Sequence, residues 1–176
     1  MPYIKEENRP EMDNVVETLY EDYLFEKELV YILFEYCNKH IRPSYNNYKN
    51  FCGELCQCAT EIERRTGARE LSIVGEDADL DNLLEFFATG IRGRKTLCDK
   101  KIAFMKEGAD IKVNGDLNYI LYCYCIRHVP TSTSEVYNKI QYGLFARELR
   151  LAAKKITKEI LAPYEDVKIE ENGDVL

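Results

Sequence analysis

A thirteen-residue segment of this chain occurs twice in closely related form. Residues 29–41 align without a gap with residues 117–129, and the residues that recur in place are Leu, Tyr, Ile, Leu, Tyr, Cys and His. In both copies a proline, a polar turn and a second amphipathic segment follow. Two copies are too few for a solenoid, which needs about three repeats or more. The pattern therefore predicts an internal duplication of a helical hairpin, packed about a pseudo-twofold axis; chance similarity of two tyrosine-rich helices is the alternative.

Apolar residues recur at helical spacing through most of the chain. This spacing predicts helices over residues 12–23, 25–41, 48–66, 80–87, 96–106, 114–128 and 135–162. Pro43 disfavours helix at the residue before it, Gly67 is a natural C-terminal stop, and Pro163 follows the last predicted helix. Ser132 and Glu135 have the spacing of a capping box at the start of that helix.

The two ends of the chain predict a small sheet. Residues 167–176 alternate apolar and polar side chains and contain Asn172-Gly173, a dipeptide typical of a tight hairpin turn. We expect residues 3–5 to pair beside this hairpin. The predicted fold is therefore mainly α, with two related helical hairpins and a small β-sheet formed by the chain termini.

These elements divide the chain into three segments. Residues 1–67 hold the N-terminal strand and the first helical hairpin repeat. Residues 68–115 form a connecting segment with short helices and a short strand over residues 70–74. Residues 116–176 hold the second helical hairpin repeat and the C-terminal β-hairpin.

Charge and composition argue against several classes of protein. The formal net charge is −7, whereas dedicated nucleic-acid-binding domains usually carry net positive charge. No apolar run approaches the roughly 20 residues of a membrane-spanning helix, and the first residues lack the apolar stretch of a signal peptide. The 7 cysteines, an odd number, fit a reducing cytoplasm better than a disulfide framework. We therefore expect a cytoplasmic protein that binds neither a membrane nor nucleic acid.

Several segments of the chain resemble a family of small, uncharacterised proteins found in bacteriophages and bacterial genomes. Residues 1–5 read MPYIK like the start of that family, residues 115–119 read GDLNY like its GELNY helix, and residues 162–175 fit its APYED-x-KI-x-x-NGDV end. A further pattern, G-x-L…E-x-x-RR, is matched by Gly53, Leu55, Glu61, Arg64 and Arg65. The family has no established activity. The resemblance implies an α-helical fold and a phage or prophage context in a bacterial host cell, and it implies no chemistry.

Two Cys-His pairs have the chemistry of zinc ligands. Cys37 with His40, and Cys125 with His128, are spaced i, i+3 at equivalent places in the two copies. Four such groups could close a tetrahedral zinc site at a pseudo-twofold axis. The simpler explanation is that they fill the core-facing stripe near each helix end. We expect no metal and no other cofactor, although only the arrangement of the two copies can decide this.

Acidic clusters in the chain lack complete metal-binding signatures. Residues 77–81 carry three aspartates at alternate positions, but the glycine and the bidentate glutamate of a calcium loop are absent. Glu54, Glu61 and Glu63 lie on one predicted helix, as carboxylates do in all-α magnesium-dependent nucleotide pyrophosphatases. The paired acidic signatures of those enzymes on neighbouring helices are missing. A solvated helix face explains these three glutamates more simply.

Basic residues give the strongest indication of a binding site. Arg92, Arg94 and Lys95 lie in a glycine-containing turn between two short predicted helices, where backbone amides and cations suit a phosphate or another anion. Arg64 and Arg65 form a second basic pair at the end of the third predicted helix. A solvated turn is the alternative explanation for the first group.

The sequence therefore favours a non-enzymatic binding protein of phage or prophage type. We expect it to act on a host protein or on a small anionic, nucleotide-like ligand, and to form a homodimer through surplus aromatic helix surface. The rival hypothesis is an all-α, magnesium-dependent nucleotide pyrophosphatase-like hydrolase using Glu54, Glu61 and neighbouring acids. No set of catalytic residues is assigned, and the question of catalysis stays open.

Overall fold

The computed structural model describes residues 4–21, 24, 27–68, 83, 85–87, 91–107 and 115–173, and this part of the chain is mainly α-helical. The predicted helical class is therefore confirmed. The helices are α1 (Arg9–Tyr20), α2 (Glu28–His40), α3 (Tyr45–Thr66), α5 (Lys95–Glu107), α6 (Asp116–His128), α7 (Glu135–Ile156) and α8 (Ala162–Asn172). Two short 3-10 turns, η1 (Glu6–Asn8) and η2 (Ile91–Gly93), precede α1 and α5, and a π-helical turn, η3 (Thr157–Leu161), joins α7 to α8.

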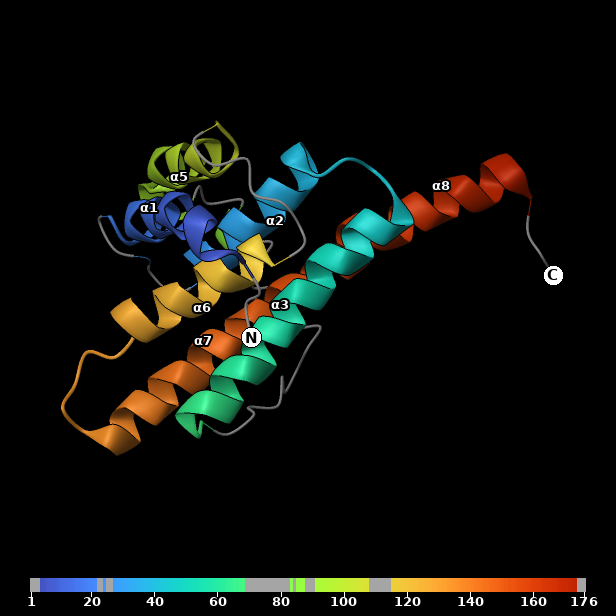
Figure 1. The fold of residues 1–176 in the computed structure, drawn as a ribbon. Coiled ribbons are helices and arrows are strands. Elements are labelled where there is room, and N and C mark those ends of the chain that lie inside the picture. The colour runs from blue at the N-terminus through green and yellow to red at the C-terminus, as the bar shows by residue number, and fades with distance from the viewer. Residues whose placement is uncertain are drawn as a thin grey trace.

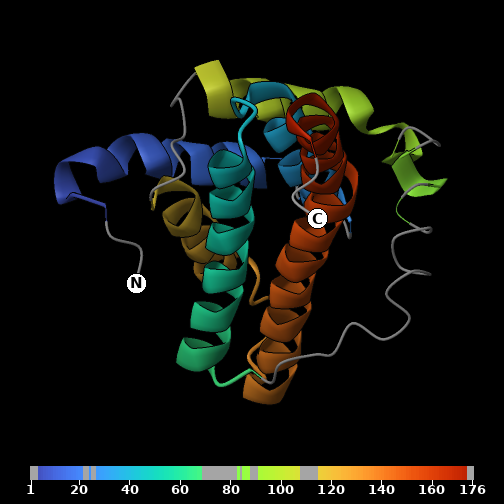
Figure 2. The ribbon, with the colours of Figure 1, turned by 90° about the vertical axis from the view of Figure 1, so that its right-hand side faces the viewer.

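The long helices α3 and α7 run antiparallel and form the spine of the molecule (Figures 1 and 2). Each has 22 residues, which corresponds to a length of about 33 Å. The shorter helices α2 and α6 have 13 residues each and lie on one side of this pair. Each packs on the long helix of the other hairpin: α2 contacts α7, and α6 contacts α3.

Helices α1 and α5 are also exchanged between the two halves of the chain. Helix α1 precedes α2 but packs on α6, whereas α5 precedes α6 but packs on α2. Two equivalent hydrogen bonds link the packed helices, one between α2 and α5 and one between α6 and α1. Tyr31 of α2 donates its hydroxyl to Asp99 of α5 (Oη–Oδ1 2.7 Å), and Tyr119 of α6 donates its hydroxyl to Asp13 of α1 (2.9 Å). The two aspartates are each the fifth residue of their helix.

The core uses the same positions in both halves. Both short helices bury apolar side chains at six equivalent positions, which are Leu29, Tyr31, Ile32, Leu33, Tyr36 and Cys37 in α2 and Leu117, Tyr119, Ile120, Leu121, Tyr124 and Cys125 in α6. The buried residues of α1 are Met12, Val15, Val16 and Leu19, and those of α5 are Cys98, Lys101, Ile102 and Met105, again at identical spacing. Burial of each large apolar side chain contributes about 1.5–3 kcal/mol. These stripes hold the short helices on the α3–α7 pair.

Glutamates from the long helices hold the first residues of the short helices. Glu148 of α7 accepts the backbone N–H of Lys27 (2.6 Å), the N-cap of α2. Glu54 of α3 accepts the backbone N–H of Gly115, the N-cap of α6. Both N-cap residues have left-handed backbone, with φ of 72° and 114° respectively. A helix start is thus held in each half by a carboxyl group from the opposite half, which accepts one of the backbone N–H groups at the helix start.

The N-termini of the long helices are capped by serines. Ser44 caps α3, and Ser134 caps α7 by accepting the backbone N–H of Tyr137 (3.4 Å). The predicted capping box of Ser132 with Glu135 is therefore wrong by two residues. Ser132 instead accepts the N–H of Ser134 (3.0 Å), which closes the turn before the helix.

The predicted C-terminal β-hairpin is wrong, and the predicted end of helix at Pro163 is wrong with it. Residues 162–172 form α8, which ends before Gly173 (φ 81°). Pro163 is tolerated because it lies in the first turn of α8, directly after the π-helical turn that shifts the backbone hydrogen bonds. Ile4 and Lys5, which were expected to pair with the hairpin, are not in a strand. Residues 1–3 and 174–176 lie outside the described residues.

Much of the predicted connecting segment also lies outside the described residues. This holds for the strand expected over residues 70–74 and for most of the helix expected over residues 80–87, of which Leu83 and residues 85–87 are described as helical. The helix expected over residues 96–106 corresponds to α5. Among the described residues, no helix combines the length and apolar character that crossing a membrane requires.

Candidate ligand-binding cavity

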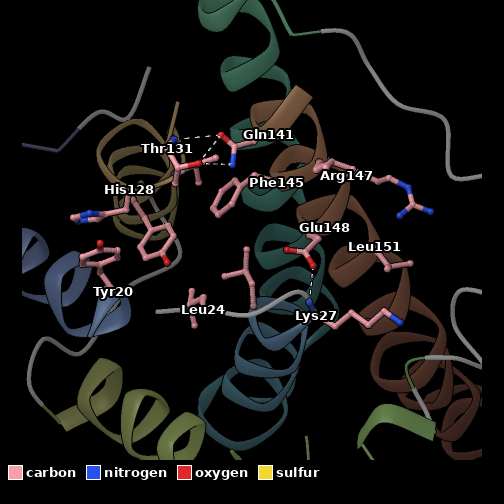
Figure 3. A pocket seen from close by; sticks show the side chains of 14 residues that line it. Tyr20, Leu24, Lys27, His128, Thr131, Gln141, Phe145, Arg147, Glu148 and Leu151 are labelled. Carbon is pink, nitrogen blue, oxygen red and sulfur yellow. Dashed lines mark hydrogen bonds between the residues drawn. The ribbon is translucent and has the colours of Figure 1, made fainter. Parts of the chain in front are cut away.

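A cavity of about 520 Å³ lies where the ends of α1 and α6 meet the start of α2 and the middle of α7 (Figure 3). Its volume is within the range of about 300–1,000 Å³ that is usual for small-molecule sites. The side chains that line it are more apolar than polar. Tyr20 and Leu24 face Phe145 and Glu148 across the hollow in Figure 3. The crossing of α1 onto α6 therefore creates this cavity.

Aromatic rings form one wall of the cavity. The ring of His128 stacks on the ring of Tyr20, with centroids 3.8 Å apart and planes at 9°. Tyr124 stacks on Phe145 (5.8 Å, 16°) and meets Tyr20 edge to face (6.4 Å). Such pairs have fixed geometry and present flat π-faces. The four rings therefore form a continuous aromatic wall in which each ring packs against another.

Contacts between α1 and α6 hold the stacked pair in place. His128 lies at the last turn of α6, and its Nε2 is 3.1 Å from Glu17 Oε1 of α1. The neighbouring Arg127 donates to Asp13 Oδ1 (3.1 Å), the same carboxylate that accepts the Tyr119 hydroxyl. The end of α6 is thus fixed to α1 on the solvent side of the cavity.

Polar groups lie on the rim and are themselves hydrogen-bonded. Gln141 accepts the backbone N–H of Thr131 (3.3 Å) and donates from Nε2 to its hydroxyl (3.0 Å), which ties the α6–α7 turn to α7. Glu148 accepts the Lys27 N–H as described above. The side chains of Lys27 and Arg147 extend away from His128 and Tyr20 in Figure 3, and Lys27 Nζ lies over the ring of Phe86 (6.0 Å). The two cations of the rim are therefore on the far side of the hollow from the His128–Tyr20 stack.

The predicted basic turn before α5 has a structural partner. Arg94 donates from Nε to Glu28 Oε2 (2.7 Å), and Glu28 is only 1% exposed. This buried ion pair fixes the start of α5 to the start of α2. Lys95 is exposed at the first residue of α5, and the side chain of Arg92 lies outside the described part of the structure.

Both arginines of the second predicted basic pair bind a glutamate of their own helix, α3. Arg64 and Arg65 both donate to Glu61, at 2.7 and 2.6 Å, and Arg65 also lies over the ring of Tyr122 (5.3 Å). This pair is at the C-terminal end of α3, at the opposite end of the bundle from Arg94 (Figures 1 and 2). The structure does not bring the two predicted basic groups together, and neither of them lines the cavity.

The glutamates of the rival hydrolase hypothesis have separate surroundings. Burial raises the pKa of Glu54 to about 7, and its Oε2 has no hydrogen-bond partner. Glu61 binds the two arginines, which lower its pKa, and Glu63 binds Arg150 (2.8 Å). Among the described residues, no group of three or more His, Cys, Asp or Glu side chains could hold a metal ion. The aspartates at residues 77–81 are outside that part of the chain.

The two Cys-His pairs lie apart, in different surroundings. His40 lies against Tyr36 (5.4 Å), whereas His128 lies against Tyr20. Cys37 and Cys125 are buried, and burial raises the pKa of the Cys37 thiol to about 12. A buried protonated thiol behaves as a small apolar side chain. These residues therefore serve as core and cavity wall in the described structure.

Sequence reasoning singled out His128 and Tyr124 through the repeat, but it missed the residues that complete the cavity. Tyr20, Phe145 and Glu148 lie on ordinary amphipathic helices, and only the exchange of α1 between the halves brings them together. Tyr20 belonged to the apolar stripe of the first predicted helix, and nothing in that stripe distinguished it from a core residue.

Comparison with known proteins identifies the family of the chain. A family model described as "Domain of unknown function (DUF6899)" matches residues 1–70 and 80–175. The chain therefore belongs to this family, in agreement with the uncharacterised family that the sequence motifs resemble. No curated protein and no solved structure matches the chain significantly.

Proposed function

We propose that this protein is a non-enzymatic binding protein, and that the cavity between α1, α6 and α7 takes a small nucleotide-like ligand. The stacked ring wall carries the proposal, because His128 on Tyr20 (3.8 Å) and Tyr124 on Phe145 (5.8 Å) offer parallel faces for a base. The volume of about 520 Å³ suits one nucleotide and leaves little room for a second.

The charges at the rim favour an anionic ligand. Lys27 and Arg147 supply two cations, and Glu148 already accepts a backbone N–H of the protein. A phosphate group beside these cations would gain charge-assisted hydrogen bonds while the base stays in the aromatic interior. A host protein that inserts an aromatic, anionic segment is the other partner compatible with this surface.

The terminal motifs add a biological context to this proposal. They resemble those of a family seen in phage and bacterial genomes, and on this proposal the protein acts in the cytoplasm of a bacterial host. Small phage proteins often act by occupying a target, an analogy that supports binding over catalysis.

We also propose that the two halves arose by internal duplication of a three-helix unit. The crossed tyrosine–aspartate bonds, the matching buried positions and the two glutamate-capped helix starts support this origin. A chance similarity between α2 and α6 would not explain why each of them has an equivalent aspartate partner, on α5 and on α1 respectively. Ligand binding on this view belongs to one of the two equivalent contacts between the copies, the α1–α6 contact where Tyr20 and His128 meet.

A thermal-shift screen tests the proposed function. AMP, ADP, ATP and GTP are added with and without magnesium, and at least one is expected to raise the melting temperature without turnover. His128→Ala removes half of the stack and is expected to abolish the shift. His40→Ala is the matched control, because His40 has the equivalent place in α2 and does not line the cavity.

Two results would contradict the proposal. Magnesium-dependent release of pyrophosphate, lost in Glu61→Gln, would establish the rival hydrolase. A nucleotide shift that survives in His128→Ala but is lost in Arg94→Ala would move the site to the start of α5.

A further inference from the structure

The N-terminal half of α7 carries an exposed apolar stripe. Val136, Ile140 and Leu144 follow one another at intervals of four residues, so they lie on one face of the helix. They are 72%, 53% and 49% exposed. We call these three residues the α7 stripe. Large apolar side chains gathered at one place on a surface indicate a contact with another segment or molecule.

The same face of α7 is covered farther along the helix. Leu151 and Lys155 come seven and eleven residues after Leu144, spacings that return to one side of an α-helix. These two residues are only 4% and 1% exposed. Lys155 Nζ lies over the rings of Phe34 and Phe87, at 4.8 Å from each. The stripe is therefore the uncovered continuation of a face that is buried in its second half.

The equivalent face of α3 is polar. Helices α3 and α7 are aligned by the two glutamates that hold the starts of the short helices. Eight and four residues before its glutamate, α7 has the last two residues of the stripe, whereas α3 has Asn46 and Asn50. Both asparagines are exposed. Where this face of the framework meets water, the chain thus uses polar side chains, and the apolar residues of α7 require another explanation.

The described chain ends and resumes beside this face of α7. Gly67, which follows α3, lies against Lys139, since a Cβ added to it would be 3.5 Å from Lys139 Cε. Soon after the chain resumes, Phe87 lies under Lys155 as described above. From Lys139 to Lys155 is about 24 Å of helix. The fourteen residues 69–82 can span up to about 46 Å, so they are long enough to follow α7 past the stripe.

We propose that the α7 stripe is the docking surface for residues 69–82 of the same chain. This segment contains an apolar run, Leu71-Ser72-Ile73-Val74, which begins four residues after Gly67 and so falls within reach of the stripe. Its three large apolar side chains match the three apolar residues of the stripe. The match to the family model stops at residue 70 and resumes at residue 80, so the family model does not cover this run.

A double-mutant cycle in the full-length protein tests the docking. Val136→Asn/Ile140→Asn changes the stripe without touching the nucleotide cavity, and Ile73→Ser/Val74→Ser changes the segment. Each variant is expected to lower the melting temperature by at least about 4 °C, because each removes apolar contact between the stripe and the segment. The combined variant should melt close to the less stable of the two, since one contact is lost only once.

Val167→Asn/Ile169→Asn on α8 is the matched control. These residues are 49% and 46% exposed, and their replacement carries a similar change in helix propensity. With no segment docked on them, the melting temperature should change by about 2 °C or less. Thermolysin, which cleaves before large apolar residues, gives a second measure. Its cleavage within residues 71–74, mapped by mass spectrometry, should be at least about tenfold faster in Val136→Asn/Ile140→Asn than in wild type.

Three results would overturn the proposal. The first is a stripe variant that melts like the α8 control and is cleaved at the wild-type rate. The second is a combined variant whose loss is the sum of the two separate losses, which would mean that the stripe and the segment do not touch. The third is a wild-type melting temperature that rises with protein concentration and no longer does so in the stripe variant, which would assign the stripe to a second copy of the chain.

Discussion

The unit α1–α3 and the unit α5–α7 share a framework but differ at the ends of their first helices. Seven residues after the shared aspartate, α1 has Tyr20 and α5 has Lys106. Tyr20 stacks on His128, while Lys106 lies near His40, where burial first and the nearby positive charge second lower the pKa of that histidine. The same histidine position thus forms an aromatic wall in one half and faces a cation in the other. If the two halves arose by duplication as proposed, this local change is what distinguishes the α1–α6 contact from the α5–α2 contact.

The long helices α3 and α7 carry equivalent ion pairs in which the order of the acid and the base along the chain is reversed. In α3, Glu61 is the acid and binds Arg65 four residues later, whereas in α7 Lys155 is the base and binds Glu159 four residues later. In both halves the cation of the pair lies over an aromatic ring of the neighbouring short helix. The rings are Tyr122 for Arg65 and Phe34 for Lys155. Each half therefore places a cation over the equivalent ring, with the opposite order of charges along the helix.

The largest expected difference between the halves concerns the stacked phenylalanines. Phe51 stacks on Tyr36 and is 0% exposed, whereas Phe145 stacks on Tyr124, lines the cavity and is 7% exposed. Phe51→Ala is expected to lower the free energy of unfolding by about 3–5 kcal/mol, and Phe145→Ala by about 2–3 kcal/mol because part of its space is already empty. Urea denaturation at fixed protein concentration measures both. Equal losses would mean that the cavity does not loosen the second half.

The next largest difference in stability is expected between the two ion pairs with opposite charge order, Lys155–Glu159 and Glu61–Arg65. Lys155 is 1% exposed, so Lys155→Ala removes packing and leaves Glu159 partly buried, at an expected cost of about 2–3 kcal/mol. Glu61→Ala leaves two arginines that water can reach, at about 1 kcal/mol. The pair Lys155→Glu/Glu159→Arg copies the order found in α3 and should recover most of the loss. No recovery would show that the order of charges in each half is fixed.

The helical framework was predictable from sequence because it depends on local periodicity. The repeat of residues 29–41 in residues 117–129 placed α2 and α6, and Gly67 marked the end of α3 as expected. Burial of the same positions in both short helices follows from the same pattern.

The C-terminal helix and the cavity could not be predicted, because their causes are non-local. Alternating residues 167–171 form a strand only when a partner strand is present, and the π-helical turn that allows Pro163 inside a helical rod has no clear sequence signature. The cavity depends on which half α1 packs against. The basic turn around Arg94 has the residue types of an anion site, but Arg94 is paired with buried Glu28, which is 66 residues away in the sequence.

Glu54, one of the two glutamates that hold the starts of the short helices, makes the stability of the fold depend on pH. Burial, with Asp116 adding to it, raises the pKa of Glu54 to about 7, whereas the N–H groups of Gly115 and Asn118 act in the opposite direction. Between about pH 4.5 and 7 the folded chain keeps this proton and the unfolded chain has released it. The free energy of unfolding should therefore fall as pH rises through this range, by about 1–3 kcal/mol from this group.

Glu54→Gln isolates that contribution. Its amide stays neutral, so the variant is expected to lose this part of the pH dependence and to gain stability over wild type as the pH rises towards 7. Urea denaturation at several pH values measures the difference between the two proteins. Parallel curves would mean that Glu54 is ionised in the folded state throughout this range.

The smallest expected effect is at the residue before each of these glutamates, which is Gly53 in α3 and Arg147 in α7. Gly53→Ala is expected to raise the free energy of unfolding by about 0.5–1 kcal/mol, since alanine is the better helix former and its Cβ meets nothing within 4 Å. The change is read as a higher denaturation midpoint with an unchanged slope. A loss of stability would indicate that α3 requires a glycine for a reason outside its own helix.

The most direct test of the account uses the two histidines of the chain, one in each half. The imidazole C–H signals in the proton NMR spectrum, assigned with His40→Ala and His128→Ala, are followed while AMP or ATP is added. We expect the His128 signals to shift in a saturable way and the His40 signals to stay in place. A shift of His40 alone, or no shift of either histidine at millimolar nucleotide, would contradict the claim that the cavity beside Tyr20 binds a nucleotide.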